Sequence, residues 1–254
     1  GPTQNDFFEA LFLSGQCNFG LEKWPEAISA FDRTWKESTS LTQRDEAYKL
    51  LLQSEFMNAK SIAASGNFEK AAIAFKSIDD KYPGSAYGDI VLFNAAEAYE
   101  KKELWLQACD NYYNLVNRYP NSKFAPDALF NAAGDYEKSD KYQKAAEAYE
   151  LLVQNYPQSE KSKDALFNLG YCYEKLGKME KMAEVNERYS ALYPDEQDVE
   201  SLLLRSAAFY MKASMFERAI AVYRNFIRRF PKSAKSVEAQ YMVGKSFSEL
   251  GDIN

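Results

Sequence analysis

The most regular feature of this chain is an apolar pattern that returns every 37 residues. An aromatic residue followed by proline marks the interval five times, at Tyr82-Pro83, Tyr119-Pro120, Tyr156-Pro157, Tyr193-Pro194 and Phe230-Pro231. Fifteen residues before each proline, and once near each end of the chain, stands an apolar residue: Trp24, Phe68, Trp105, Tyr142, Met179, Phe216 and Ile253. A period of this length predicts a stack of small repeated units rather than one closed core.

Within each interval the apolar positions follow helical spacing. Three residues after the first apolar position comes alanine, and four residues later an aromatic residue: Ala27/Phe31, Ala71/Phe75, Ala108/Tyr112, Ala145/Tyr149 and Ala219/Tyr223. Earlier in the interval a small residue precedes an aromatic one by three: Ala96/Tyr99, Ala133/Tyr136, Gly170/Tyr173, Ala207/Tyr210 and Gly244/Phe247. These spacings place side chains on one helical face, and small residues let a second helix approach closely. Each interval therefore predicts two packed helices, for example over 125–139 and 142–155.

Residues typical of helix ends and turns fall between the predicted helices. Proline cannot continue a helix, so each aromatic-proline pair predicts a helix end. Two residues after four of the prolines stands a serine suited to the loop or cap before the next helix: Ser85, Ser122, Ser159 and Ser233. Gly66, Gly177 and Gly251 predict the turn inside the unit.

This order of small, aromatic, alanine, aromatic and proline positions resembles the tetratricopeptide repeat. The resemblance covers essentially the whole chain and implies an all-α, right-handed α-solenoid of helix-turn-helix repeats. The expected units are 6–43, 44–84, 85–121, 122–158, 159–195 and 196–232, followed by the first helix of a seventh at 233–254. Gly1-Pro2 resembles the scar of a cleaved tag, and the chain is expected to be a fragment of a longer protein.

The family repeat is three residues shorter, and the extra residues here fall in the Tyr-Pro-x-Ser loop. The longer form is similar to repeats in bacterial cell-envelope proteins: the periplasmic partner of the Tol-Pal system, the repeat lipoprotein of the outer-membrane barrel assembly machine, and envelope-spanning motility machines. The resemblance implies a bacterial periplasmic or cell-envelope location, with a cytoplasmic location as the alternative.

Two irregularities interrupt the pattern. The first and second units are separated by seven extra residues around 37–45, which predicts a longer helix or loop there. In the fifth unit Met182 replaces the alanine and Asn186 replaces the aromatic residue. A buried polar residue costs stability unless it finds a partner, so we expect a looser joint or altered curvature, with a pocket or partner contact as the alternative.

Polar residues recur on the first helices of successive units. Asn94, Asn131 and Asn168 stand at the same repeat position, and Arg205 occupies the next one. Seven residues later, on the same helical face, stands a lysine: Lys101, Lys138, Lys175 and Lys212. In the resembled family the asparagine position lines the concave groove and grips an extended peptide. A side-chain amide suits this role because it both donates and accepts hydrogen bonds, and the lysines favour an acidic segment or a carboxylate terminus.

A purely structural role for these residues remains the alternative. Asparagine also bonds neighbouring helices, and lysine in the last turn of a helix is favoured by the helix dipole. Glu100, Glu137 and Glu174 directly precede three of the lysines and would neutralise part of their charge. Only Asn168 and Arg205 match the five polar residues of the cytoplasmic chaperone-tail clamp, so binding of such a tail is not expected.

Composition narrows the function. The chain has no histidine, which removes the commonest general base and metal ligand, and it shows no phosphate loop, paired-cysteine motif or nucleophile motif. We therefore expect no enzyme activity and no cofactor. The net charge of −6 argues against nucleic acid, and no segment is apolar enough to span a membrane. Cys17, Cys109 and Cys172 fall in separate units, which predicts buried, unpaired thiols.

The sequence thus predicts a protein-interaction scaffold of a bacterial envelope complex that holds an extended or disordered segment of a partner protein in the groove. A cytoplasmic adaptor with the same groove is the alternative within binding proteins. A structural spacer, or an arm that self-associates end to end in a larger machine, is the alternative from another class.

Overall fold

The computed structural model describes residues 4–251, and over this range the chain consists of helices joined by short turns, without a strand. The expected tag scar at Gly1-Pro2 and the repeat position Ile253 lie outside the described residues. The chain divides into two compact units, one up to Ala128 and one from Leu129 onward. The repeat boundaries expected from the sequence are finer than this division and stay a prediction.

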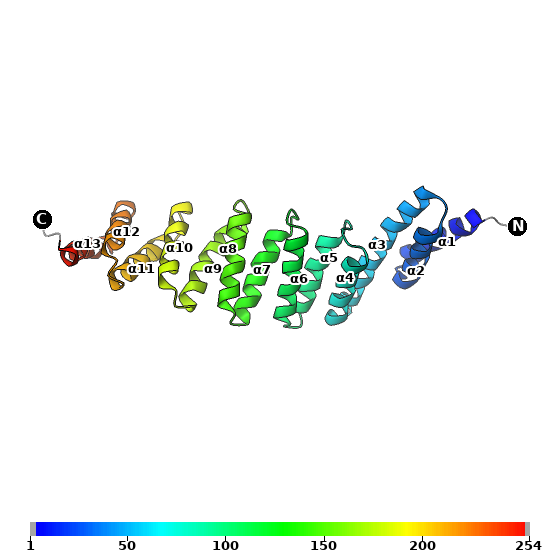
Figure 1. Ribbon diagram of the computed structural model, residues 1–254, viewed down its shortest axis with the longest axis horizontal. Coiled ribbons are helices and arrows are strands. Elements are labelled where there is room, and N and C mark those ends of the chain that lie inside the picture. The colour runs from blue at the N-terminus through cyan, green and yellow to red at the C-terminus, as the bar shows by residue number, and fades with distance from the viewer. Residues whose placement is uncertain (1–3, 252–254) are drawn as a thin grey trace. The chain divides into compact units, whose positions relative to one another are not determined.

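The first unit contains six complete helices, shown in blue to green in Figure 1. They are α1 (Gln4–Gly20), α2 (Trp24–Glu37), α3 (Leu41–Ala64), α4 (Phe68–Lys81), α5 (Gly88–Glu100) and α6 (Trp105–Arg118). Each helix packs against the next one along the chain. A seventh helix, α7 (Ala125–Lys138), begins in this unit and continues into the second.

The second unit repeats the arrangement with six further helices. They are α8 (Tyr142–Asn155), α9 (Lys161–Lys175), α10 (Met179–Leu192), α11 (Val199–Lys212), α12 (Phe216–Arg229) and α13 (Ser236–Leu250). From α8 to α13 each helix again packs against its successor. Helices α7 and α8 confirm the two that the spacing predicts, with α7 ending one residue earlier than expected.

The aromatic-proline pairs end the second helix of a repeat, as predicted. Tyr82, Tyr119, Tyr156, Tyr193 and Phe230 are the C-cap residues of α4, α6, α8, α10 and α12. The N–H of each aromatic residue donates to the carbonyl four residues earlier, and the following proline has no N–H to continue the ladder. The serines that follow lie in the loop: the Oγ of Ser122, Ser159 and Ser233 accepts the N–H two residues on.

The turn between the two helices of a repeat uses a residue in the left-handed conformation. Gly66, Gly177 and Gly251 have positive φ, as their positions predict. Four other turns place a non-glycine residue there, Glu22, Glu103, Asp140 and Ser214, with φ between 55 and 58°. At Glu103 the next N–H, of Leu104, donates back to the carbonyl of Tyr99 and closes the helix end. The turn geometry is therefore conserved along the chain even where glycine is absent.

The extra residues between the first two repeats form helix rather than loop. Helix α3 has 24 residues, whereas the other helices have 13 to 17. Ser40 caps it, since its side chain accepts the N–H of Gln43. The sequence left helix and loop open at this point, and the structure selects the longer helix.

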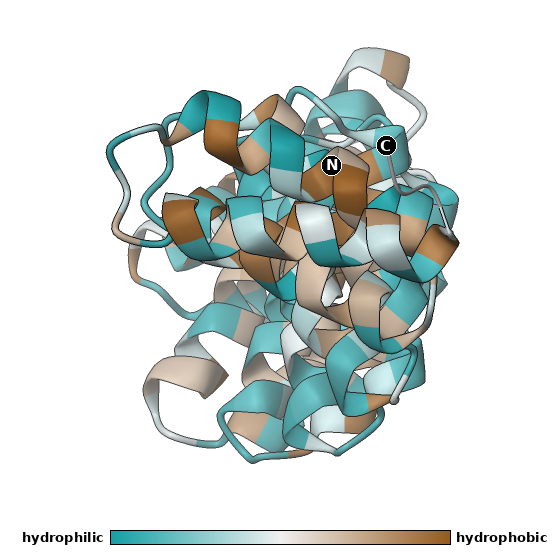
Figure 2. Cartoon of the chain, turned by 90° about the vertical axis from the view of Figure 1, so that its left-hand side faces the viewer, coloured by the Kyte–Doolittle hydropathy of each residue, from teal (hydrophilic) through white to brown (hydrophobic). Residues whose placement is uncertain are grey.

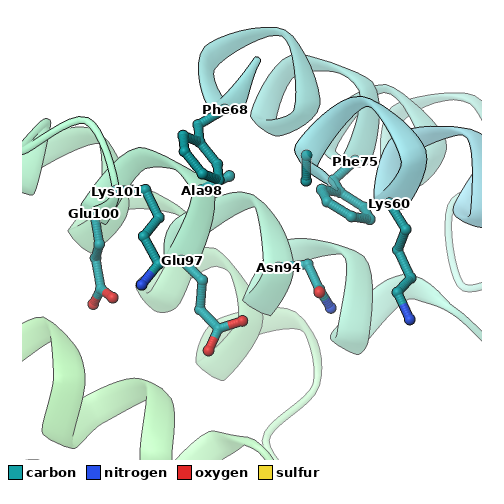
Figure 3. Close-up of a pocket in the computed structure, with 9 residues that line it drawn as sticks. Lys60, Phe68, Phe75, Asn94, Glu97, Ala98, Glu100 and Lys101 are labelled. Carbon is teal, nitrogen blue, oxygen red and sulfur yellow. The ribbon is translucent and has the colours of Figure 1, made fainter. Parts of the chain in front are cut away.

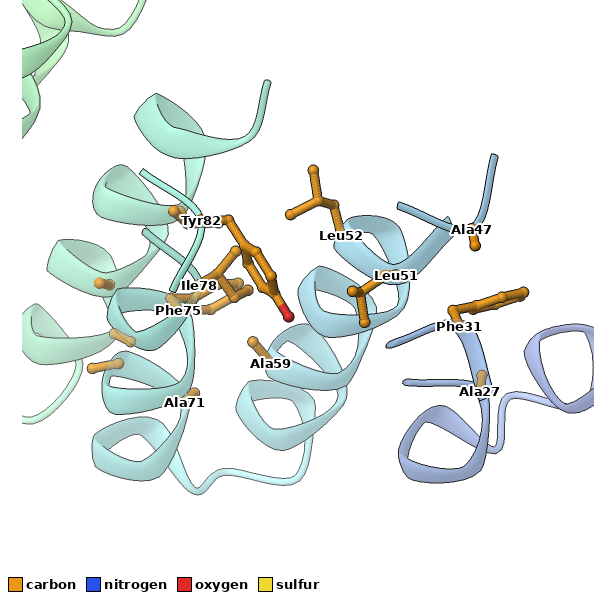
Figure 4. Close-up of a cluster of buried hydrophobic side chains, with 14 of the residues drawn as sticks. Ala27, Phe31, Ala47, Leu51, Leu52, Ala59, Ala71, Phe75, Ile78 and Tyr82 are labelled. Atoms are coloured by element: carbon orange, nitrogen blue, oxygen red, sulfur yellow. The ribbon is translucent and has the colours of Figure 1, made fainter. Parts of the chain in front are cut away.

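The core of the first unit alternates alanine with large apolar side chains (Figure 4). Ala27, Ala59 and Ala71 are fully buried, and Phe31 and Phe75 fill the spaces that the small residues leave. The helices carry both hydrophobic and hydrophilic residues (Figure 2), as expected where one side of a helix is buried and another faces water. Burial of aromatic residues of this kind is worth about 3 to 5 kcal/mol each when they are truncated to alanine.

One buried ionic contact ties α4 to α6 in the first unit. The Asp79 carboxylate is buried and pairs with Arg118, and the Tyr119 hydroxyl donates to its other oxygen at 2.9 Å. Gly88 makes this possible, because a Cβ there would lie 2.0 Å from the Tyr119 hydroxyl. Three repeats later, Arg229 fills the position of Arg118 but donates to backbone carbonyls instead.

Candidate functional site

The predicted asparagines are half-buried and already hold bonds within the protein. The Asn94 amide donates to the Ile90 carbonyl on its own helix at 2.7 Å. The Asn168 amide donates to the Tyr149 hydroxyl on α8 at 3.2 Å, so it links two helices. Both keep their side-chain oxygen without a hydrogen bond from the residues that the structure describes. Asn131, on α7, also makes interactions within the protein.

The predicted cations differ in what surrounds them. Arg205 pairs with Glu174 at 2.7 Å, and Lys138 pairs with Asp135, also at 2.7 Å. Lys175 lies over the ring of Tyr171 at 5.2 Å. The remaining two lysines, at 101 and 212, make no ion pair within residues 4–251. The cations are therefore not equivalent along the chain, although their sequence positions are.

A first hollow of about 260 Å³ lies among α3, α4 and α5 (Figure 3). Its lining residues are Lys60, Ala63, Phe68, Phe75, Asn94, Glu97, Ala98, Glu100 and Lys101. Two of them, Asn94 and Lys101, are residues that the sequence singles out. Burial raises the pKa of the Glu97 carboxyl above its ordinary value, and the Lys101 ammonium opposes that rise.

A second hollow of about 540 Å³ lies among α9, α10 and α11 of the second unit. Its lining residues are Glu174, Met179, Met182, Arg205, Ala208, Phe209, Lys212 and Ala213. Six of them stand three repeats after residues of the first hollow: Glu174 after Ala63, Met179 after Phe68, Arg205 after Asn94, Ala208 after Glu97, Phe209 after Ala98 and Lys212 after Lys101. The fold thus produces the same kind of hollow at equivalent repeat positions, with different chemistry in each.

A tyrosine-carboxylate bond inside the repeat is present in the third and fourth repeats and absent from the fifth. Tyr112 donates to Glu100 at 3.0 Å, and Tyr149 donates to Glu137 at 2.7 Å, each from the second helix of a repeat to its first. Burial and the bond to Glu137 both raise the pKa of Tyr149, which therefore stays protonated. In the fifth repeat Asn186 replaces this tyrosine, and the corresponding carboxylate, Glu174, pairs with Arg205 instead.

The two exceptional residues of the fifth repeat compensate for each other. Asn186 and Met182 are both buried, and the Asn186 amide donates to the Met182 sulfur at 2.9 Å. The methionine side chain is longer than that of the alanine in the other repeats, and the asparagine side chain is smaller than their aromatic ring. The buried amide therefore has a partner, and the looser joint or altered curvature expected here stays a prediction. Met182 also lines the second hollow, in line with the alternative of a pocket.

A third hollow, of about 380 Å³, contains Asn168 together with Phe130, Phe167 and Tyr189. Its lining residues include an ion pair between Lys163 and Glu196, whose side-chain nitrogen and oxygen lie 2.8 Å apart. Glu196 stands where the other loops have serine. Each of these three hollows therefore contains at least one predicted residue, while Asn131, Lys138 and Lys175 line none of them.

The cysteines only partly follow the prediction. None of the three forms a disulfide, and Cys109 and Cys172 are buried, but Cys17 is exposed. The correction arises because Cys17 lies on α1, where only three residues are buried. Burial raises the pKa of the Cys172 thiol to about 12, and the nearby Glu137 adds to the rise.

Metal-ligand groups and membrane-spanning helices also bear on function. Among residues 4–251 no group of three or more cysteine or carboxylate residues is placed to hold a metal ion. No helix in the same range is long and apolar enough to cross a membrane.

Two family models, both described as tetratricopeptide repeat, match the chain: one at residues 130–196 and the other at 91–122 and 200–233. This chain belongs to the tetratricopeptide repeat family. Members of the family are generally non-catalytic protein-interaction scaffolds, and the fold indicates protein partners. A comparison with curated protein sequences gave no match.

Solved structures share the fold at low identity. A chain of the Naa15/Naa10 complex bound to HypK-THB is 14% identical with a TM-score of 0.54, over 96% of this chain and 34% of that one. The similarity supports an all-α helical-repeat solenoid. This chain spans about a third of the length of that larger protein. YrrB, a tetratricopeptide repeat protein with an unusual peptide-binding site, is 14% identical with a TM-score of 0.44, over 74% of this chain and 91% of that one. A repeat protein from Parabacteroides merdae is 15% identical with a TM-score of 0.42, over 96% and 87%.

The tyrosine-carboxylate bonds are the functional feature that the sequence analysis missed. Their signal is present in the sequence, because Glu100 and Tyr112 recur as Glu137 and Tyr149 at the same separation. In the sequence, Glu100 and Glu137 stand out first as the residues directly before Lys101 and Lys138. Their bond to the second helix ties their charge to the inside of the repeat.

Proposed function

We propose that this protein is a non-catalytic scaffold that binds an extended segment of a partner protein along the first helices of its repeats. The observation that carries the proposal is the recurrence of a hollow at equivalent repeat positions, each lined by residues at the predicted asparagine and lysine positions. A binding surface built from repeats presents such sites at a regular interval, which suits an extended chain.

The polar groups of these hollows match a peptide backbone. The Asn94 and Asn168 side chains each offer an oxygen that accepts no hydrogen bond from the described residues, and peptide N–H groups are its natural donors. Lys101 and Lys212 make no ion pair within the described chain, so acidic residues of the segment would be favoured. Phe68 and Met179 supply apolar surface beside these polar groups.

Partner capture tests the proposal. Lysate of the source cells is passed over the wild-type protein and over the variant Asn94→Ala/Asn131→Ala/Asn168→Ala, after circular dichroism has shown that both are folded. The matched control is Asn114→Ala/Asn117→Ala/Asn155→Ala, which changes three exposed asparagines outside the hollows. A partner lost only from the first variant supports groove binding, whereas equal capture by all three proteins contradicts it.

For the cellular setting we propose a bacterial envelope complex, with a cytoplasmic adaptor as the alternative. The support is the 37-residue form of the repeat with its Tyr-Pro-x-Ser loop. Fractionation of the source cells, with detection by an antibody raised against this chain, distinguishes the two. Recovery with periplasmic or membrane fractions supports the envelope, and recovery with the cytosol contradicts it.

A second candidate role is self-association through α13. Val237 and Tyr241 lie one turn apart on this helix, and they are 79% and 71% exposed. Adjacent exposed apolar side chains of this size are typical of a contact surface. Sedimentation velocity over a concentration series tests this role: a dimer present for the wild type and lost in Val237→Lys/Tyr241→Lys supports it, and a wild-type monomer throughout contradicts it.

A further inference from the structure

The second hollow differs from the first in charge as well as in size. Where the first hollow has the carboxylate of Glu97, the second has Ala208, and the only carboxylate in its lining, Glu174, is already paired with Arg205. Lys212 adds a second cation without an ion-pair partner in the described chain. The lining of the second hollow therefore carries one net positive charge, whereas the charges of the first hollow cancel.

Its apolar walls are also more pliable. Met179 and Met182 come from α10 and Phe209 comes from α11, whereas the first hollow has two phenylalanines and no methionine. Methionine is unbranched and polarisable, so it adapts to ligand side chains of different shapes. The hollow is about twice as large as the first, and its volume of about 540 Å³ falls within the range typical of ligand sites.

In the repeat where Asn186 replaces the tyrosine, Arg205 keeps N–H donors that can bind a ligand. Without a tyrosine at this position, Glu174 lies at the hollow and holds the Arg205 guanidinium through one nitrogen at 2.7 Å. A guanidinium has five N–H donors, so the others remain for an incoming carboxylate. The Arg205 side chain is 45% exposed and is reached from solvent without any rearrangement of the helices.

We infer that the second hollow is a specificity site that takes one large apolar side chain of the partner segment, flanked in that segment by carboxylates that bind Arg205 and Lys212. This inference rests on the proposed function and adds to it the chemical identity of the segment. The first hollow, with its balanced charges and smaller volume, should favour acidic residues less than the second hollow does.

Methionine methyl groups provide a local readout. The chain has six methionines; two line the hollow, and Met57 and Met242 lie elsewhere as internal controls. The protein is labelled with carbon-13 at the methionine methyl groups and titrated with a capped heptapeptide that has a central leucine between two pairs of aspartates and glycine at each end. One comparison peptide replaces the leucine by alanine, and another replaces the aspartates by lysines.

We expect the acidic leucine peptide to shift the Met179 and Met182 signals and to bind at least about tenfold more tightly than the alanine peptide, because a buried leucine side chain removes more apolar surface from water than alanine does. The lysine peptide should leave these signals unchanged. Equal shifts from the leucine and alanine peptides, or shifts from the lysine peptide, would overturn the inference.

A charge variant tests the electrostatic part without removing a contact. Ala208→Glu restores the carboxylate of the first hollow at an exposed helical position, and it should weaken the acidic leucine peptide about two- to fivefold. The matched control, Ala221→Glu, makes the same change at an exposed position on α12 outside the hollow and should have no effect. Equal weakening in both variants overturns the inference. If the peptides fail here while partner capture still depends on the three asparagines, the proposed function stands and only this site is refuted.

Discussion

The paired exchange in the fifth repeat makes a sharp prediction about stability. The other repeats have alanine and an aromatic residue where this repeat has Met182 and Asn186. The variant Met182→Ala/Asn186→Tyr restores the common pair, and each single variant leaves the pair mismatched. Comparing all four proteins measures how strongly the two positions depend on each other.

The magnitudes follow from the packing. Met182 is 2% exposed, so Met182→Ala leaves a cavity and should cost about 2 to 4 kcal/mol. Asn186→Tyr alone forces a ring against the Met182 side chain, whose sulfur lies 2.9 Å from the amide, and should cost about 1 to 3 kcal/mol through overpacking. In the double variant the ring occupies the space that the methionine vacates. We therefore expect stability within about 1 kcal/mol of the wild type, which, with single-variant costs of about 3 and about 2 kcal/mol, is a coupling of about 5 kcal/mol.

Urea unfolding followed by far-ultraviolet circular dichroism gives the four free energies of unfolding. The new tyrosine should also compete with Arg205 for Glu174, as Tyr149 holds Glu137 in the fourth repeat. Ala145→Met provides a matched control, because it places methionine beside an intact tyrosine and should destabilise the protein by about 1 to 3 kcal/mol. Free energies that add within about 0.5 kcal/mol would refute the compensation between Met182 and Asn186.

Three further predictions concern the turns, the buried ion pair and the thiols. Gly66→Ala should destabilise by about 1 kcal/mol because its φ of 81° strains any side chain, whereas Glu103→Gly should not destabilise; thermal unfolding compares them, and equal losses would contradict the turn argument. Arg118→Ala leaves the buried Asp79 carboxylate without its cation and should cost about 2 to 4 kcal/mol in urea unfolding, partly relieved in Arg118→Ala/Asp79→Asn; no relief would contradict a charge effect. At pH 8 a disulfide reagent should modify one thiol per native chain and none in Cys17→Ser, since the other two thiols are buried; fast reaction of two or more thiols would contradict this.

Local signals in the sequence were sufficient for the helices. The aromatic-proline pairs end five of them and the spacing places α8 correctly, because proline and helical periodicity act over a few residues. The left-handed turn at Glu103 was not predicted, since the residue there does not itself favour that conformation. It is held by the packing of the two helices that it joins, so repetition of the pattern rather than residue type was the usable signal.

The candidate site was predicted only in part. The sequence placed Asn94, Lys101, Arg205 and Lys212 at recurrent positions of the first helices, and tertiary structure decided that they line two hollows.

By itself the sequence determined that the chain is a stack of helical pairs, because that information lies in local periodicity and in residues that end helices. Only the tertiary structure decided which polar groups are committed to one another. Asp79 meets Arg118 from 39 residues away, and Glu174 meets Arg205 because a tyrosine is missing at position 186. The energy of such contacts depends on geometry between helices, which a residue's position along the chain does not specify.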